Sequence, residues 1–212
     1  MRIKKSNSYW VLSPVLGILL FILLYFVAAL LYPGGSDFNR SGTGFSWQHN
    51  YWCELLAADA QNGQLNTARP VAILAMIVLM ISLIIFWYTI PGLFAGKRTG
   101  SRMIRCTGIG SMLVIPLLLT GFHDHVINTA ALLGCIAIII LLVNLFRHRM
   151  LLLLGTGILC LLLCGVNNYV YYSKDLLTYL PVIQKISFLI FLLWFSLLSL
   201  ALYKRGALVS SL

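Results

Sequence analysis

Six apolar runs, each close to the length that crosses a bilayer, constrain most strongly how this chain can fold. A membrane-spanning helix needs about 20 apolar residues, because the hydrocarbon core is about 30 Å thick. The runs that fit cover residues 10–32, 71–90, 103–120, 126–146, 150–166 and 181–203. The fifth is short, and we expect it to extend toward Tyr172. The pattern predicts an all-α integral membrane bundle of six transmembrane helices in a single domain, residues 1–212.

Composition agrees with a membrane protein and excludes a nucleic-acid-binding one. Hydrophobic residues make up 60% of the chain and charged residues 9%, against roughly 25% charged in soluble domains. The net charge of +10 arises from basic residues that flank the apolar runs and form no soluble patch. We therefore expect membrane lipids as partners, with a membrane or periplasmic protein as a further possibility, and no nucleic acid.

The distribution of charge predicts which way the chain crosses the membrane. With the N-terminus in the cytoplasm and alternating spans, the inner side receives no acidic residue and eleven of the 15 basic ones: Arg2, Lys4, Lys5, Lys97, Arg98, Arg102, Arg105, Arg147, Arg149, Lys204 and Arg205. All five acids fall outside. Basic residues resist translocation, so the bias predicts a multi-pass protein of the bacterial inner membrane with both termini inside. The first run exceeds the 7–15 residues of a signal peptide and is expected to be a retained helix.

The outer side carries the unusual residues. Its first loop, residues 33–69, is long, and its apolar content favours an ordered structure. Two further outer segments are Phe122-His-Asp-His125 and Asn167-Asn-Tyr-Val-Tyr-Tyr172. Because these segments reach the same membrane face, we expect a polar and aromatic substrate site there, formed by Trp47, Asn50, Trp52, Arg69, Asn167, Asn168, Tyr172 and Lys185.

Each of these residues also has a structural interpretation. Tyr and Trp at a membrane edge commonly form an interfacial belt. Lys185 either extends its ammonium outward to water or forms an ion pair with Asp124 or Glu54.

The His123-Asp124-His125 sequence, expected on a tight turn, allows three interpretations. His49, His123 and His125 are candidate ligands of a zinc ion, which requires three or four ligands. Glu54, His123 and Asp124 are alternatively candidate catalytic groups for acid–base chemistry. The third interpretation is a hydrogen-bonded structural turn. No GxSxG, Walker or GxGxxG motif is present.

Two resemblances follow from particular residues. The chain resembles six-span bacterial membrane proteins of unknown function, which implies an architecture and no activity. The residues that carry this resemblance are Leu31-Tyr-Pro-Gly-Gly-Ser36, Phe45-Ser-Trp47, His49-Asn-Tyr-Trp-Cys53, Asn66-Thr-Ala-Arg-Pro70 and Asn167-Asn168. Trp52-Cys53-Glu54 and Asn66-Thr67 are similar to elements of alkaline ceramidases, seven-span membrane hydrolases that hold calcium and zinc. That resemblance implies a calcium ligand at Glu54. The chain departs from that family because no histidine follows His148 and one span fewer is predicted.

The predicted function is therefore to bind or process a lipid or another amphipathic molecule on the outer face, including possible lipid hydrolysis. The alternative is a non-enzymatic subunit or assembly factor of a membrane complex. A solute transporter is disfavoured, because the span interiors are almost wholly apolar. Gly108, Gly110 and Pro116 in the third run predict close packing or a kink.

Overall fold

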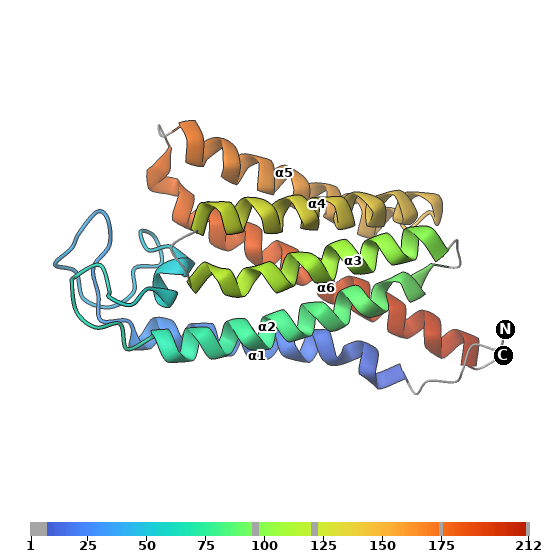
Figure 1. Cartoon of the computed structure of the whole chain (residues 1–212), viewed down its shortest axis with the longest axis horizontal. Helices are drawn as coiled ribbons and strands as arrows, with labels where there is room; N and C mark the ends of the chain where they lie inside the picture. Colours follow the sequence, from blue (N-terminus) through green and yellow to red (C-terminus); the bar gives the residue numbers. More distant parts are fainter. Residues whose placement is uncertain (1–7, 95–97, 120–122, 174–175, 211–212) are drawn as a thin grey trace. The chain divides into compact units, whose positions relative to one another are not determined.

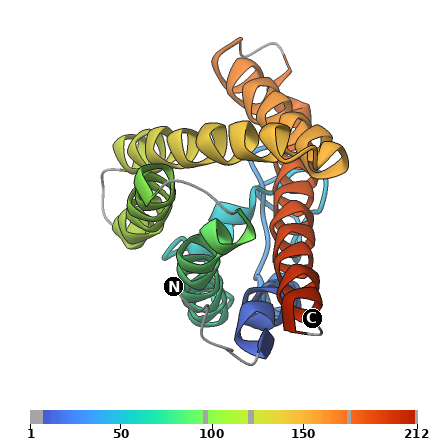
Figure 2. The same ribbon diagram turned by 90° about the vertical axis from the view of Figure 1, so that its right-hand side faces the viewer.

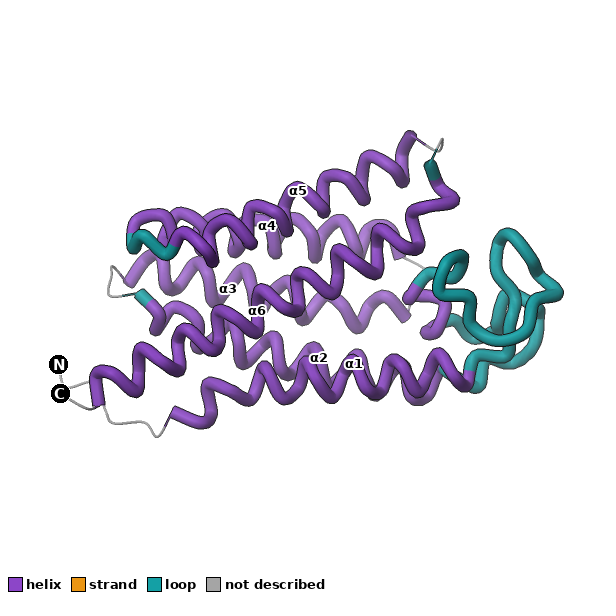
Figure 3. Tube along the Cα trace, turned by 180° about the vertical axis from the view of Figure 1, so that it is seen from behind, coloured by secondary structure: helices purple, strands orange, loops and turns teal. Residues whose placement is uncertain are grey.

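The computed structural model describes residues 8–94, 98–119, 123–173 and 176–210, and within them it contains helices and loops and no β-strand (Figure 3). The α-helices are α1 (Ser13–Leu31), α2 (Arg69–Thr89), α3 (Arg98–Val114), α4 (His123–Arg147), α5 (Leu151–Ser173) and α6 (Leu180–Ser210) (Figure 1). Short 3-10 helices are η1 (Ser8–Leu12), η2 (Trp52–Leu56), η3 (Ile90–Leu93), η4 (Ile115–Leu119) and η5 (Leu177–Tyr179).

Five helical segments in the described residues are long and apolar enough to cross a membrane. They are Tyr9–Leu31, Arg69–Leu93, Asn128–Arg147, Leu151–Ser173 and Leu177–Gly206. Large apolar side chains on these helices are exposed, among them Leu30 at 72% and Leu152 at 78%, as lipid-facing residues would be. The chain therefore has the helices of a multi-pass membrane protein. The predicted extension of the fifth run is confirmed, because α5 continues to Ser173.

α3 differs from the other helices because its first turns are polar. Arg98, Arg102 and Arg105 lie in its first half. The helix changes to the 3-10 geometry of η4 at Ile115, next to Pro116, whose ring cannot occupy the interior of a regular α-helix. The predicted irregularity at Pro116 is therefore present.

The chain divides into two compact units. Unit 1 comprises Met1–Ile18, Leu79–Gly157 and Leu193–Leu212, and unit 2 comprises Leu19–Val78 and Ile158–Leu192. α1, α2, α5 and α6 each contribute to both units.

In unit 1, α3 and α4 run antiparallel and pack closely. A Cβ atom added at Gly110 would lie 3.6 Å from Leu133, and one added at Gly134 would lie 3.9 Å from Ser111. Figure 1 shows the two helices running in opposite directions, so the start of α3 and the end of α4 lie toward the same end of unit 1.

In unit 1, contacts join the start of α1 to α6, α6 to the residues after α2, and these residues to the turn after α4. The rings of Tyr9 and Tyr203 are 6.1 Å apart, and Figure 2 shows the start of α1 (blue) beside the end of α6 (red). Arg205 donates a hydrogen bond to the carbonyl of Leu93 (2.5 Å), and the ring of Phe94 lies 5.3 Å from that of His148. We call this end, with Arg102, Arg105, Arg147, Arg149 and Arg205, the basic end of unit 1.

Unit 2 contains the loop between α1 and α2, which was predicted to be an ordered loop of the outer side. Its two ends are joined, because the Thr67 hydroxyl donates to the Leu31 carbonyl (2.6 Å) and the Gln61 amide donates to the Tyr32 hydroxyl (3.0 Å). Gly34 and Gly35 have φ values of 141° and 84°, which side chains rarely tolerate, so the turn after α1 requires glycine there.

Candidate functional site

A buried asparagine organises the polar centre of unit 2. Asn50 is fully buried and lies two residues before η2. Its amide nitrogen donates to the Gly35 carbonyl (2.7 Å) and to a carboxylate oxygen of Glu54, while its amide oxygen accepts from the Ser46 backbone (2.7 Å). This one side chain therefore holds three parts of the loop together.

Glu54 is the acidic member of this centre. Its side chain is only 8% exposed, one carboxylate oxygen accepts from Asn50, and Oε1 has no hydrogen-bond partner among the described residues. Burial raises the pKa of Glu54 above its ordinary value, while the Asn50 hydrogen bond and, more weakly, the nearby Lys185 ammonium lower it. A buried carboxyl with a raised pKa is a candidate for proton exchange.

Lys185 lies at this centre from the side of α6, 7% exposed. Its ammonium donates to the Asn50 carbonyl (2.6 Å) and to the Pro181 carbonyl (2.8 Å), so it joins α6 to the loop. The side chain therefore does not extend outward to water. Within the described residues it forms no direct ion pair with Glu54, since Asn50 lies between the two charges. The alternative pairing with Asp124 falls on a side chain outside the described residues.

An aromatic cluster underlies the polar centre. Trp52 packs edge-on against Tyr25 and Phe188, both with ring centroids at 5.3 Å, and against Phe21 at 6.2 Å. The Tyr25 hydroxyl donates to the Trp52 carbonyl (3.2 Å). Trp52 thus packs η2 against α1 and α6.

Trp47 lies at the rim of the site and lines a groove. It is 47% exposed and stacks on Phe26 with ring centroids 5.8 Å apart. The groove has a volume of about 740 Å³ and is open on one side. Apart from Gln48 and Thr178 its lining is apolar or aromatic: Trp47, Leu176, Tyr179, Val182 and Ile183.

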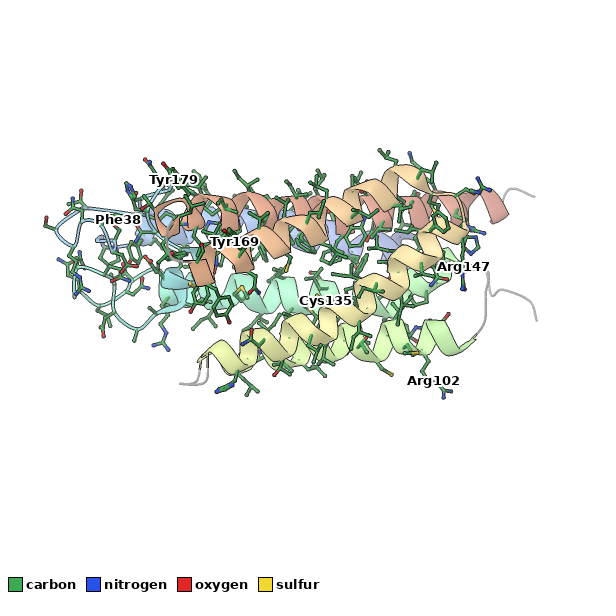
Figure 4. All side chains as sticks on the ribbon, turned by 90° about the horizontal axis from the view of Figure 1, so that it is seen from above. Phe38, Arg102, Cys135, Arg147, Tyr169 and Tyr179 are labelled. Carbon is green, nitrogen blue, oxygen red and sulfur yellow. The ribbon has the colours of Figure 1, made fainter. Side chains whose placement is uncertain are left out.

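The remaining predicted binding residues are in unit 2, but among the described residues no hydrogen bond or ring contact joins them to Asn50, Glu54 or Lys185. Asn167 donates to the Ser187 hydroxyl (2.6 Å), which links α5 to α6. Asn168 and Tyr172 are exposed on α5, and Figure 4 shows the neighbouring Tyr169 side chain there. Arg69 begins α2 and is half-buried.

The histidines do not form a metal site within the described residues. His49 Nδ1 lies 3.2 Å from the Ser46 hydroxyl, and its ring lies 4.9 Å from that of Phe38. His125 is exposed, and no three His, Cys, Asp or Glu side chains gather in the part of the chain that the structure describes. His123 begins α4, so its backbone is helical and does not form the expected tight turn. The side chains of His123 and Asp124 lie outside the described residues, and a zinc or calcium site that includes them stays a prediction.

Sequence reasoning did not include Asn66 in the site. Its buried amide nitrogen donates to the carbonyls of Glu54 and Ala57, both at 3.0 Å, and its oxygen accepts from the Ala68 backbone (3.1 Å). Asn66 thus joins the end of η2 to the residue that precedes α2. The one indication of its role in the sequence is that Asn66-Thr67 comes shortly before an apolar run.

Buried polar atoms without partners concentrate in unit 2. Five occur among the described residues, and four of them are Glu54 Oε1, Arg69 Nε, Asn167 Oδ1 and Gln184 Oε1. A buried group left without a hydrogen bond costs about 1–3 kcal/mol, so such groups usually bind water or a ligand. Comparison with known proteins adds no assignment, because no family model, curated protein or solved structure matches the chain.

Proposed function

We propose that the chain is a six-span protein of the bacterial inner membrane, with both ends in the cytoplasm, that binds a lipid or similar amphipathic molecule on its outer face. The groove between Trp47 and the start of α6 is the observation that carries the binding proposal. Its volume falls within the usual 300–1,000 Å³ of small-molecule sites.

Two observations support the topology. Tyr9, before α1, and Tyr203 and Arg205, in the last turns of α6, all lie at the basic end of unit 1, as an even number of spans requires. The described acidic side chains of unit 2, Asp37, Glu54 and Asp59, belong to the loop between α1 and α2, whereas the arginines of unit 1 flank the α2–α3 and α4–α5 connections.

Thiol labelling tests this topology. In a Cys53→Ser background, Gln64→Cys in the outer loop is expected to react with a membrane-impermeant maleimide in intact spheroplasts, and Lys204→Cys only after lysis. Both positions are exposed, so access depends on the side of the membrane. Labelling of Lys204→Cys in intact spheroplasts would contradict the orientation.

The occupant that best fits the groove is an acyl chain. Val182 and Ile183 belong to the membrane-span candidate Leu177–Gly206, close to its outer end, and Trp47 and Tyr179 are typical of the bilayer interface. A lipid in this groove would meet apolar side chains at the depth of its own hydrocarbon.

Binding is favoured over hydrolysis by the position of Glu54. Its carboxylate is buried beneath Asn50 and does not line the groove. A substrate in the groove would therefore not reach the carboxylate without a rearrangement of the loop.

Filling the groove should weaken lipid binding at this site. We expect Ile183→Trp to reduce the affinity for phospholipid at least about 10-fold, because the indole would occupy the apolar volume. Ile186→Trp is the control, since Ile186 is exposed on the same helix and does not line the groove. Native mass spectrometry of delipidated protein with phospholipid added back gives the measurement. Equal retention by both variants would refute the site.

A docking role is the second candidate function. Tyr169, Tyr171, Tyr172 and Tyr179 are each at least 50% exposed in unit 2, and Figure 4 shows Tyr169 and Tyr179 on its surface. Exposed tyrosines are common in protein interfaces. Photocrosslinking from position 179 to a protein rather than to lipid would favour a subunit or assembly factor.

A further inference from the structure

We infer that the basic end of unit 1 binds anionic phospholipids through Arg102, Arg147 and Arg149. This inference is independent of the groove in unit 2. It rests on uncompensated charge, on the position of the arginines toward one end of unit 1 and on the apolar surface beside them.

The charge at this end has no counterpart in the protein. Among the described residues, Arg102, Arg147 and Arg149 are exposed, and their side chains have neither a hydrogen bond nor a carboxylate within ion-pairing distance. In unit 1 the sequence contains one acidic residue, Asp124. It belongs to the first turn of α4, about 35 Å along the helix from Arg147 at 1.5 Å per residue.

Two other arginines of this end, Arg105 and Arg205, already bind other parts of the protein. Arg105 donates to the Tyr88 carbonyl (2.8 Å) and stacks on the Tyr88 ring at 4.8 Å. Arg205 donates to the Leu93 carbonyl. These two stabilise the protein, whereas the other three keep their planar donor groups available for an external anion.

The available arginines lie toward the same end of unit 1, on separate helix ends. Arg102 lies near the start of α3 and Arg147 in the last turn of α4, and Figure 4 shows both side chains at the same end of these helices. Arg149 follows in a turn with φ of 57°. Guanidinium groups bind phosphate in a bidentate manner, so this end favours phosphate.

The neighbouring surface identifies the anion as a lipid. Met103 is 47% exposed next to Arg102, and Phe146 is 64% exposed next to Arg147. After Arg149, Leu151 and Leu152 are 62% and 78% exposed. The phosphate of a phospholipid would bind the arginines while its acyl chains cover the apolar side chains. A soluble phosphate would leave these apolar side chains uncovered.

Lipid-binding measurements on the purified full chain test the inference. Delipidated protein in neutral detergent is titrated with phosphatidylglycerol, phosphatidylcholine or soluble glycerol phosphate, with native mass spectrometry as the readout. We expect phosphatidylglycerol to bind best, with an affinity that falls as salt increases. Each of Arg102→Gln and Arg147→Gln should weaken it about 5-fold, and the double variant about 30-fold, since each basic residue contributes about 1 kcal/mol.

The controls separate charge from folding. Arg40→Gln removes an exposed arginine of the outer loop and should leave phosphatidylglycerol binding within about 2-fold of the unchanged protein. Arg102→Lys keeps the charge and should retain most of the affinity, and circular dichroism confirms the helix content of each variant. Equal binding of phosphatidylcholine, unchanged binding in the double variant, or displacement by glycerol phosphate at equal concentration would overturn the inference.

Discussion

Lys185→Met is expected to lower the free energy of unfolding by about 3 kcal/mol. Methionine preserves most of the apolar stem but removes the ammonium, which donates to the carbonyls of Asn50 and Pro181 from a nearly fully buried position. The loop then loses its polar bond to α6, and the buried Glu54 loses its nearest cation. Reversible unfolding of the purified protein in mixed micelles measures the change.

A second substitution and a pH series isolate the role of charge. Glu54→Gln should recover part of the loss in Lys185→Met, because it removes the uncompensated carboxylate. Burial raises the pKa of Glu54 in the folded protein above its ordinary 4.5, so the folded state holds the proton more tightly than the unfolded state. The stability of Lys185→Met should therefore be greatest below this value and should fall as pH rises toward the folded-state pKa.

The control for this series is Lys204→Met, an exposed lysine of α6, which should change stability by less than about 0.5 kcal/mol. If Lys185→Met were equally benign, the link between loop and helix would contribute nothing to stability.

Gly157→Ala is expected to destabilise unit 1 by about 1–3 kcal/mol. A Cβ atom at position 157 would overlap the ring of Trp194 and the side chain of Leu142. The ring cannot readily move, because Trp194 is 1% exposed and its indole nitrogen donates to the Leu153 carbonyl (2.8 Å). Tryptophan fluorescence during unfolding gives both the stability and the displacement of the ring.

Gly155→Ala is the matched control on the same helix. A Cβ atom there meets nothing within 4 Å, and alanine favours a helix over glycine by about 0.5–1 kcal/mol. We therefore expect Gly155→Ala to be neutral or stabilising. A similar loss at both positions would show that helix propensity, and not contact with Trp194, determines the result.

The apolar runs predicted the helices well, because the length of a bilayer-spanning segment is set by the solvent. α2 covers Arg69–Thr89 where residues 71–90 were expected. Helix ends in polar sequence were less predictable. α6 continues to Ser210, seven positions past the expected 203, because a helix can extend beyond its apolar part. Likewise α3 begins at Arg98, five positions before the expected 103, although its first half is too polar for a span.

The candidate site was predicted only at the level of which residues share a face. Asn50, Glu54 and Lys185 were assigned to the outer side from charge and span order. Their contacts could not be derived, since Lys185 bonds to the backbone of a residue 135 positions away. Asn66 acts through backbone carbonyls, which leave no pattern in side-chain chemistry.

The bond between the Thr67 hydroxyl and the Leu31 carbonyl joins the two ends of the loop between α1 and α2. The end of α1 and the residues before α2 therefore stay next to each other, whatever conformation the residues between them adopt. The segment in between can therefore grow, shrink or change its chemistry while the helices beneath keep their spacing. Such an arrangement lets specificity diverge on a conserved scaffold, as antibody loops do on their sandwich.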